Sequence, residues 1–311
     1  MKTLCILFLS ITSIVFSQEK KFKTEEIAID SLIKGTLFTP EKISKNTKLV
    51  ILIAGSGPTN RYGNQFGGVT NCLKFLAEDI ASKDVAVFSY DKRLFAQMKS
   101  GKIDEKSMRF GDMVIDAQNV VNYFKSEKKF KKIIVAGHSE GSLVGILSSL
   151  KNVNGFISLA GPGRPIDDVL KEQLLKQVPN LEAEINENLA KLKEGKTFEL
   201  TSKNPTIISI FRESVQPYMI SWIKYNPVIE IKKLKIPVLI INGTQDLQVT
   251  ESDARLLKVA YPKATLEIIE NMNHLFKETK TEQENRKSYN DGKIPVMTIL
   301  SEKIVDFIKS I

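Results

Sequence analysis

The pentapeptide at positions 137–141 reads Gly-His-Ser-Glu-Gly and matches the pattern Gly-x-Ser-x-Gly. The apolar run before it, at 133–136, is typical of a buried strand, and residues 142–150 after it are typical of a helix. A serine at a sharp strand-to-helix turn projects its hydroxyl above the end of the sheet, and the flanking glycines let the two backbones approach. The pattern therefore predicts that Ser139 is a nucleophile.

A serine hydroxyl needs a neighbouring base to accept its proton, and the chain has two histidines, His138 and His274. His138 adjoins Ser139, so we expect its side chain to point to a different side of the turn, out of reach of the hydroxyl. His274 lies in a polar loop after the apolar run 266–269, at the edge where parallel sheets assemble their sites. We therefore predict that His274 is the general base.

The base needs a carboxylate that fixes its tautomer and stabilises the imidazolium ion. Asp246 follows the apolar run 238–241, just past the end of another predicted strand. The competitors are Asp253, inside the next predicted helix, and Glu270, which ends the strand before His274. We predict that Asp246 is the partner of the base and interpret the two competitors as surface charges.

Attack on a carbonyl group builds negative charge on its oxygen, and backbone N–H groups must stabilise that charge. One donor is expected from Glu140, directly after the nucleophile, with its carboxylate pointing away from the site. The second is expected from the glycine-rich turn at 54–64, where we favour Ser56 and keep Gly57 as the alternative. Because only the N–H of Glu140 takes part, we expect its side chain to be dispensable.

The elements that must position these residues alternate along the chain. Continuously apolar strands separated by amphipathic helices indicate a mostly parallel central sheet with helices on both faces, an α/β fold class. Strand-like runs occur at 26–29, 32–38, 49–54, 85–89, 133–136, 156–159, 238–241 and 266–269, and helical patterns occur at 69–82, 110–124, 142–150, 253–259 and 296–308.

One region interrupts the alternation. Residues 162–235 contain no strong strand, and their patterns at 169–176, 181–192 and 217–225 are helical. An insertion of this kind between two core strands is expected to form a helical cap over one edge of the sheet. We therefore predict a single domain over residues 18–311 with one helical cap.

The first 17 residues resemble a secretory signal peptide, with Lys2 followed by an apolar stretch and small residues near a cut before Gln18. The stretch is interrupted by polar residues and is too short for an uninterrupted membrane span, so none is expected in the mature chain. Cleavage would remove Cys5 and leave Cys72, which we interpret as a small buried apolar residue. The expected location is periplasmic or secreted.

Composition excludes several classes of protein. The 311 residues are 42% hydrophobic and 26% charged, which is typical of a folded domain. The net charge of +9 comes from lysines spread along the whole chain without a nucleic-acid-binding motif, so no nucleic-acid partner is expected. Two cysteines and two histidines without metal-ligand spacing remove the common zinc sites, and we expect no metal.

The chain resembles the α/β-hydrolases, in which the order Ser, Asp, His is expected, and is similar to bacterial serine esterases of the serine-aminopeptidase-like branch. It departs from relatives in the loops near the site, where Asn-Arg-Tyr-Gly at 60–63 stands in place of Asp-Arg-Asp-Gly and Leu94 and Ala96 replace glycines. Beyond the three candidate residues the resemblance rests on Gly-Ser-Gly-Pro at 55–58, Ser-Tyr-Asp-Lys-Arg at 89–93, Ser-Val-Gln-Pro at 214–217, Asn-Gly-Thr-Gln-Asp-Leu-Gln-Val at 242–249 and Asn-His at 273–274.

The resemblance implies hydrolysis of small-molecule carboxylic esters, commonly with short acyl chains, through an acyl-enzyme and without a cofactor. It also implies that the cap shapes the acyl or alcohol pocket, with Phe211, Tyr218, Met219 and Trp222 as candidate lining residues that equally suit packing of the cap. An aminopeptidase or acyltransferase using the same three residues remains an alternative, because fold and motif do not separate these chemistries. A non-catalytic secreted binding protein is a second one, and the oligomeric state is left open.

Overall fold

Eight strands form a single sheet within residues 21–311, the part of the chain that the computed structural model describes. The predicted signal peptide lies outside these residues. Several strands are runs of Val, Ile and Leu, which suit strands buried on both faces. The strands are β1 (Phe22–Ala28), β2 (Lys34–Pro40), β3 (Leu49–Ile53), β4 (Ala86–Tyr90), β5 (Ile133–His138), β6 (Gly155–Leu159), β7 (Val238–Gly243) and β8 (Thr265–Ile269).

The strand order is β1-β2-β4-β3-β5-β6-β7-β8. All pairs from β4 to β8 are parallel, whereas β1 pairs antiparallel with β2, and β2 antiparallel with β4. In this order β3 lies between β4 and β5, so the chain changes its direction of progress across the sheet at β3. Because the central strands are parallel, their carboxyl ends meet at one edge, where doubly wound sheets build their sites.

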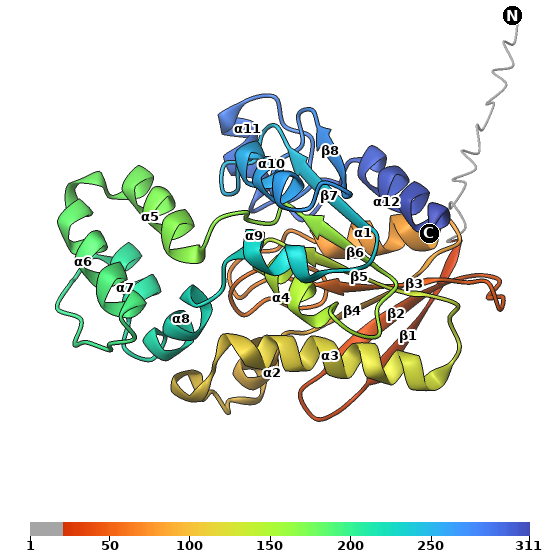
Figure 1. The fold of residues 1–311 in the computed structure, drawn as a ribbon, viewed down its shortest axis with the longest axis horizontal. Helices are drawn as coiled ribbons and strands as arrows, with labels where there is room; N and C mark the ends of the chain where they lie inside the picture. Colours follow the sequence, from red (N-terminus) through yellow and green to blue (C-terminus); the bar gives the residue numbers. More distant parts are fainter. Residues whose placement is uncertain (1–20) are drawn as a thin grey trace, which may run out of the picture.

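Helices cover both faces of the sheet (Figure 1). The mostly parallel sheet with helices on both faces, predicted from the sequence, is confirmed. The helices are α1 (Cys72–Ala81), α2 (Arg93–Ser100), α3 (Phe110–Glu127), α4 (Glu140–Ser148), α5 (Ile166–Gln177), α6 (Glu182–Lys193), α7 (Pro205–Phe211), α8 (Gln216–Ile223), α9 (Pro227–Glu230), α10 (Glu251–Ala260), α11 (Glu282–Ser288) and α12 (Thr298–Ser310).

Alternate residues of each central strand supply two separate apolar cores. Ile51 of β3 lies in one cluster with Val120 of α3 and Ile146 of α4. Its neighbour Leu52 points to the opposite face, in a second cluster with Leu76 of α1. Successive side chains of a strand point to opposite faces of a sheet, so a continuously apolar strand serves both layers at once.

The segment between β6 and β7 contains no described strand and forms α5 to α9. Helices α5, α6, α7 and α8 lie beyond one end of the sheet, at the left of Figure 1. We call these four helices the cap. Helix α9 instead contacts α4 and α10 and belongs to the layer over the sheet. The last part of the helical segment that we expected at 162–235 therefore returns to the core before β7 begins.

Four helices were not predicted from the sequence: α2, α7, α9 and α11. Helix α2 is eight residues long, and none of its residues is buried. Helix α11 reads EQENRKS and begins with a capping box between Thr281 and Glu284. Among the described helices, none is long and apolar enough to cross a membrane.

The turn between β5 and α4 brings two backbones into contact. A Cβ atom on Gly137 would lie 2.0 Å from the carbonyl oxygen of Gly141. A Cβ atom on Gly141 would lie 2.5 Å from the carbonyl oxygen of Ile53 and 2.7 Å from that of Ala54. These neighbours are backbone atoms of the turn and of the β3 end, so the strand-to-helix turn fits against β3 only with glycine at both positions.

Replacing Gly141 with alanine is expected to lower the free energy of unfolding by about 1–3 kcal/mol, because the new methyl group overpacks against fixed backbone. Gly111 in α3 has open space around it, so Gly111→Ala is the matched control, expected to be neutral or stabilising by up to about 1 kcal/mol. Urea denaturation measures both. Equal effects of the two substitutions would contradict the close approach.

Candidate active site

Ser139 occupies the turn between β5 and α4 with φ 55° and ψ −121°. A positive φ is uncommon for a residue other than glycine and marks a strained backbone. The amide of Ser139 donates a hydrogen bond of 2.9 Å to the carbonyl of Leu159, at the end of β6. Its hydroxyl has no hydrogen-bond partner within residues 21–311, which leaves Oγ free for a substrate.

A cavity of about 420 Å³ opens in front of Ser139. We call it the nucleophile cavity. Its walls combine the turn after β3, the turn after β5 and the loops after β7 and β8. The cavity is lined by Gly55, Ser56, Thr59, Gly63, Gln65, Gly68, Thr70, Cys72, His138, Ser139, Gln248, His274, Leu275, Tyr289 and Asn290.

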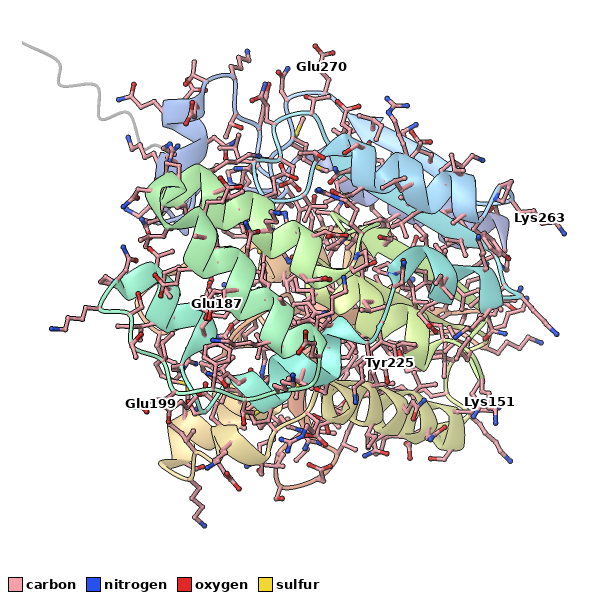
Figure 2. All side chains as sticks on the ribbon, turned by 60° about the vertical axis from the view of Figure 1, so that its left-hand side comes forward. Lys151, Glu187, Glu199, Tyr225, Lys263 and Glu270 are labelled. Carbon is pink, nitrogen blue, oxygen red and sulfur yellow. The ribbon has the colours of Figure 1, made fainter. Side chains whose placement is uncertain are left out.

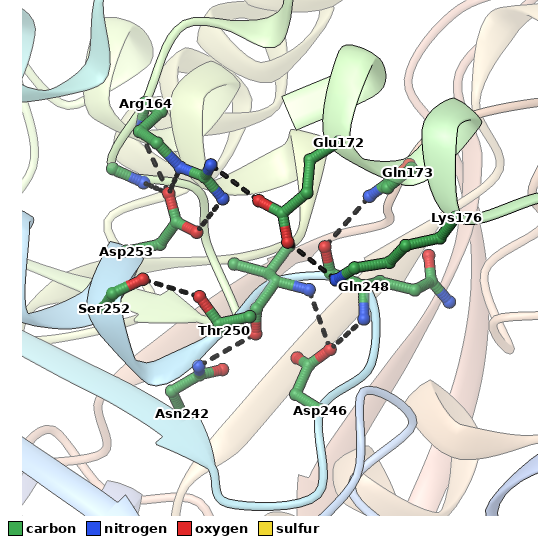
Figure 3. Close-up of polar contacts among 12 residues, drawn as sticks. Arg164, Glu172, Gln173, Lys176, Asn242, Asp246, Gln248, Thr250, Ser252 and Asp253 are labelled. Atoms are coloured by element: carbon green, nitrogen blue, oxygen red, sulfur yellow. Dashed lines mark hydrogen bonds and ion pairs between the residues drawn. The ribbon is translucent and has the colours of Figure 1, made fainter. Parts of the chain in front are cut away.

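His274 and Asp246 are joined by a hydrogen bond of 2.8 Å between Nδ1 and Oδ2. Both side chains are buried. The second carboxylate oxygen, Oδ1, accepts the amides of Gln248 and Val249 at 2.9 Å each (Figure 3). A carboxylate can only accept from the ring, so Nδ1 carries a proton, and in the neutral form of the ring Nε2 is the basic nitrogen.

The structure places Ser139 and His274 on the walls of one cavity and Asp246 behind His274. The Nε2 atom of His274 has no partner among the described residues. Catalytic hydrogen bonds are often long in a structure without substrate and tighten when it binds. The arrangement places a hydroxyl and a carboxylate-bound imidazole on one cavity, with no hydrogen bond between Ser139 Oγ and His274 Nε2 in residues 21–311.

His138 has a role that sequence reasoning missed. Its ring also lines the nucleophile cavity, and its Nε2 donates a hydrogen bond of 2.9 Å to the backbone carbonyl of His274. The two imidazoles lie 4.7 Å apart between ring centroids. Burial, together with the neighbouring His274, lowers the pKa of His138 to about 3, so the ring stays neutral and holds the loop that carries His274.

The expected oxyanion donors lie on two sides of Ser139. Ser56 lines the nucleophile cavity, whereas Gly57 does not. The N–H group of Ser56 has no partner in the described part of the chain, and its carbonyl is held by Gln65 Nε2 at 2.8 Å. Glu140 is the first residue of α4, where a backbone N–H has no partner inside the helix.

We expected the Glu140 side chain to be dispensable, but the structure buries it and pairs both of its carboxylate oxygens. It is 3% exposed, and its Oε2 accepts a hydrogen bond of 2.8 Å from Lys92 Nζ. Its Oε1 accepts the hydroxyl of Tyr218, which comes from α8 in the cap. Removing this carboxylate would leave a buried ammonium group without its counter-ion, which is costly. The carboxylate is therefore part of the structure of the site.

Asp253 is likewise not a surface charge. Its side chain is fully buried and accepts the amide of Gly163 at 3.0 Å and two guanidinium bonds from Arg164, as Figure 3 shows. It thereby anchors the start of the cap. Glu270, the other competitor, is exposed and points outward (Figure 2), in agreement with a surface charge.

A second cavity of about 420 Å³ lies under the cap. We call it the cap cavity. Ser56 and Gln65 line both cavities, so the two are neighbours. Three of the four candidate cap residues line it, whereas Phe211 is buried elsewhere in the core. The cap cavity is lined by Ser56, Gly57, Pro58, Gln65, Lys92, Leu94, Glu105, Met108, Met113, Glu140, Ser209, Ile210, Arg212, Val215, Tyr218, Met219 and Trp222.

Cys72 begins α1 and forms part of the wall of the nucleophile cavity. It is 1% exposed and unpaired, as expected for a small buried residue. Burial raises the pKa of its thiol, which keeps it protonated. No group of acidic, histidine or cysteine side chains among residues 21–311 is arranged to hold a metal ion.

Residues 66–280 match the family described as serine aminopeptidase, S33. The chain belongs to this family. The matched residues include the elements that carry Ser139, Asp246 and His274. The resemblance to the serine-aminopeptidase-like α/β-hydrolases is confirmed.

Esterase EstD from Thermotoga maritima is 28% identical to the chain over 262 residues. The match covers 82% of this chain and 60% of EstD, so the chain spans about three fifths of the length of this curated relative.

Solved structures share the fold. Est1E from Butyrivibrio proteoclasticus superposes with a TM-score of 0.58 at 16% identity, covering 92% of this chain and 98% of Est1E. An acylaminoacyl peptidase from Pyrococcus horikoshii gives a TM-score of 0.56 at 12% identity, covering 95% of this chain and 42% of the peptidase. At such identities the likeness shows the fold alone, and esterases and peptidases both use it.

The low pKa of His138 predicts how stability depends on pH. An unfolded histidine binds a proton near pH 6.5, whereas folded His138 does so at about pH 3. The contribution of neutral His138 to the free energy of unfolding is therefore fully present above pH 6.5. It is lost as the pH falls toward 3, at up to about 1.4 kcal/mol per pH unit. His138→Gln keeps a neutral donor and removes the titration, so its slope between pH 6.5 and 5 is expected to be flatter.

Urea unfolding at several pH values measures the two slopes. The other titratable groups are common to both proteins, so the comparison isolates His138. Identical slopes in wild type and His138→Gln would show that His138 is not held neutral in the folded protein.

Proposed function

We propose that the protein is a serine hydrolase that cleaves carboxylic esters through an acyl-enzyme, with Ser139, His274 and Asp246 as its catalytic residues. The observation that carries the proposal is the 2.8 Å hydrogen bond from His274 to Asp246, which makes Nε2 the basic nitrogen of the neutral ring, on a residue that lines the same cavity as Ser139. The S33 family membership and the similarity to Esterase EstD support the same reaction class.

In this mechanism Ser139 Oγ bonds to the carbonyl carbon while its proton passes to His274 Nε2. The carbonyl oxygen becomes an oxyanion and accepts the N–H groups of Ser56 and Glu140. The bond to the alcohol then breaks, and the alcohol leaves with the proton from Nε2. Water repeats the sequence on the acyl-enzyme, releasing the acid and restoring the Ser139 hydroxyl. Asp246 stabilises the imidazolium ion at both stages.

The charges beside the site favour an ester over a peptide with a free amine. An aminopeptidase needs an acidic group free to bind that amine. The two acidic side chains that line the cap cavity are both paired: Glu140 with Lys92, and Glu105 with Arg212 and Ser214. Burial opposes ionisation of Glu105, but the bonds from Arg212 and Ser214 outweigh it and lower its pKa. An ester requires no such amine partner.

We further propose that the acyl group of the ester occupies the cap cavity. Half of its lining side chains are apolar, including Met219 and Trp222 of α8. A cavity of about 150 Å³ is enough to bind benzene, so about 420 Å³ accommodates chains longer than acetyl as well as the short ones that the resemblance implies. Export of the enzyme is also proposed, on residues 1–17 alone.

Ser139→Ala is expected to lower kcat/KM for p-nitrophenyl butyrate at least 1000-fold, and Asp246→Asn by about 10³–10⁴, because the base loses its tautomer. Exposed Ser252 on α10 provides the control Ser252→Ala, which is expected to keep full activity. Equal rates in wild type and Ser139→Ala would favour the non-catalytic binding protein. Faster turnover of amino-acid p-nitroanilides than of esters would favour the aminopeptidase.

Filling the cap cavity is expected to shorten the accepted acyl chain. Val215→Trp narrows the cavity, so kcat/KM for p-nitrophenyl octanoate should fall at least about tenfold while that for the acetate changes less than about threefold. Val259→Trp is the matched control, since Val259 is 76% exposed on α10. A uniform loss across the acyl series would place the acyl group elsewhere.

A further inference from the structure

Lys92 places a buried ammonium group in contact with Gly55, which precedes one expected oxyanion donor, and with the side chain of Glu140, which supplies the other. The residue follows β4 and is 7% exposed. Its Nζ donates a hydrogen bond of 3.0 Å to the carbonyl oxygen of Gly55 and one of 2.8 Å to Oε2 of Glu140. One cation therefore contacts both the loop after β3 and the residue that follows the nucleophile.

The carbonyl of Gly55 belongs to the same peptide unit as the N–H of Ser56. No peptide bond in the described residues is cis, so this unit is planar and its C=O and N–H point in opposite directions. Holding the oxygen therefore fixes the direction of the N–H. The Ser56 N–H is unpaired in the described chain, and an ammonium on the carbonyl end polarises the unit and strengthens this donor.

The loop is close enough to Ser139 for this orientation to matter. A Cβ atom on Gly55 would lie 3.2 Å from the Cβ of Ser139. A rotation of the Gly55–Ser56 peptide would therefore change the direction of the Ser56 N–H relative to the oxyanion of an intermediate bonded to Ser139. Oxyanion donors act only when they are aimed at the position that the oxygen occupies in the transition state.

Glu140 and Tyr218 keep the ammonium in place. Glu140 supplies the counter-charge, and its second carboxylate oxygen is satisfied by the Tyr218 hydroxyl. A buried ion pair is retained at low cost only when its remaining hydrogen-bonding capacity is also met. Because Tyr218 belongs to α8, the cap helix takes part in fixing this geometry.

We propose that Lys92 is a positioning residue that orients the Ser56 N–H toward the oxyanion by binding the Gly55 carbonyl, with Glu140 as its counter-ion. This inference rests on the proposed ester hydrolysis. It extends that function because Lys92 touches no reacting atom and acts through a peptide unit. An interaction that improves only in the transition state changes kcat and leaves KM nearly unaltered.

Lys92→Met removes the ammonium and keeps an unbranched side chain. We expect kcat for p-nitrophenyl butyrate to fall about 10- to 100-fold, with KM within about threefold of wild type. The matched control is Lys48→Met: Lys48 also donates to backbone carbonyls, those of Ile308 and Ile311 near the C-terminal end of α12. It should leave kcat within about twofold.

The double variant Lys92→Met/Glu140→Met separates positioning from simple charge burial. Lys92→Met alone leaves the Glu140 carboxylate buried without its cation, which by itself destabilises the site. The double variant removes both charges and still leaves the Gly55 carbonyl without a donor. We expect its kcat to stay within about threefold of Lys92→Met. Recovery of kcat to near the wild-type value would overturn the positioning role.

Inhibition by butylboronic acid provides a readout that a purely structural role would not move. The boron atom bonds to the serine Oγ and becomes tetrahedral, with an oxygen at the oxyanion position. Its inhibition constant is expected to rise by the same factor as kcat falls in Lys92→Met and in the double variant. An unchanged inhibition constant beside a reduced kcat would overturn the proposal.

Failure of the inference is distinguishable from failure of the proposed function. A wild-type protein without Ser139-dependent ester hydrolysis would overturn both. An active wild type, inactive as Ser139→Ala, whose kcat is unaltered by Lys92→Met would overturn the role of Lys92 alone.

Discussion

The contact between the β5–α4 turn and the end of β3 is the constraint on which the rest of the site depends. With glycine at 137 and 141, the turn lies against the carbonyls of Ile53 and Ala54. This contact holds Ser139 at a positive φ with its hydroxyl in the nucleophile cavity, and it places the first amide of α4 beside that hydroxyl. The loop that carries Ser56 continues directly from β3, so the same contact brings both expected oxyanion donors to one point.

Buried charges near the site are all held by specific partners. Asp246 is held by two amides and His274, Glu140 by Lys92 and Tyr218, and Asp253 by Arg164. An unpaired buried charge is destabilising, whereas a paired and hydrogen-bonded one fixes the position of its neighbours. The first two networks orient groups around the cavity, and the third anchors the cap at its first residues. The same hydrogen bonds therefore neutralise the buried charges and fix the positions of the groups around the cavity.

The sheet and the placement of the candidate residues could be predicted because they depend on local pattern. Apolar strands such as β3 and β5 are distinctive, and side chains after the ends of parallel strands meet at one edge. The destinations of Glu140 and Asp253 could not be predicted, because their partners Lys92 and Arg164 lie far away in the sequence and no local signal links them. His138 was missed for a related reason: its partner is a backbone carbonyl, which leaves no trace in residue type. Helix α2 has eight residues, fewer than the roughly 11–18 over which helical periodicity is read.

The proposed mechanism requires that Ser139 itself becomes acylated. The most direct measurement is acid quenching during turnover of p-nitrophenyl butyrate, followed by mass spectrometry of the tryptic peptide that spans residues 133–151. We expect a butyryl group on Ser139 that is formed within the first turnover and disappears once substrate is exhausted. A transient butyryl group on another side chain, such as the Cys72 thiol in the same cavity, or turnover without any acylated peptide, would contradict it.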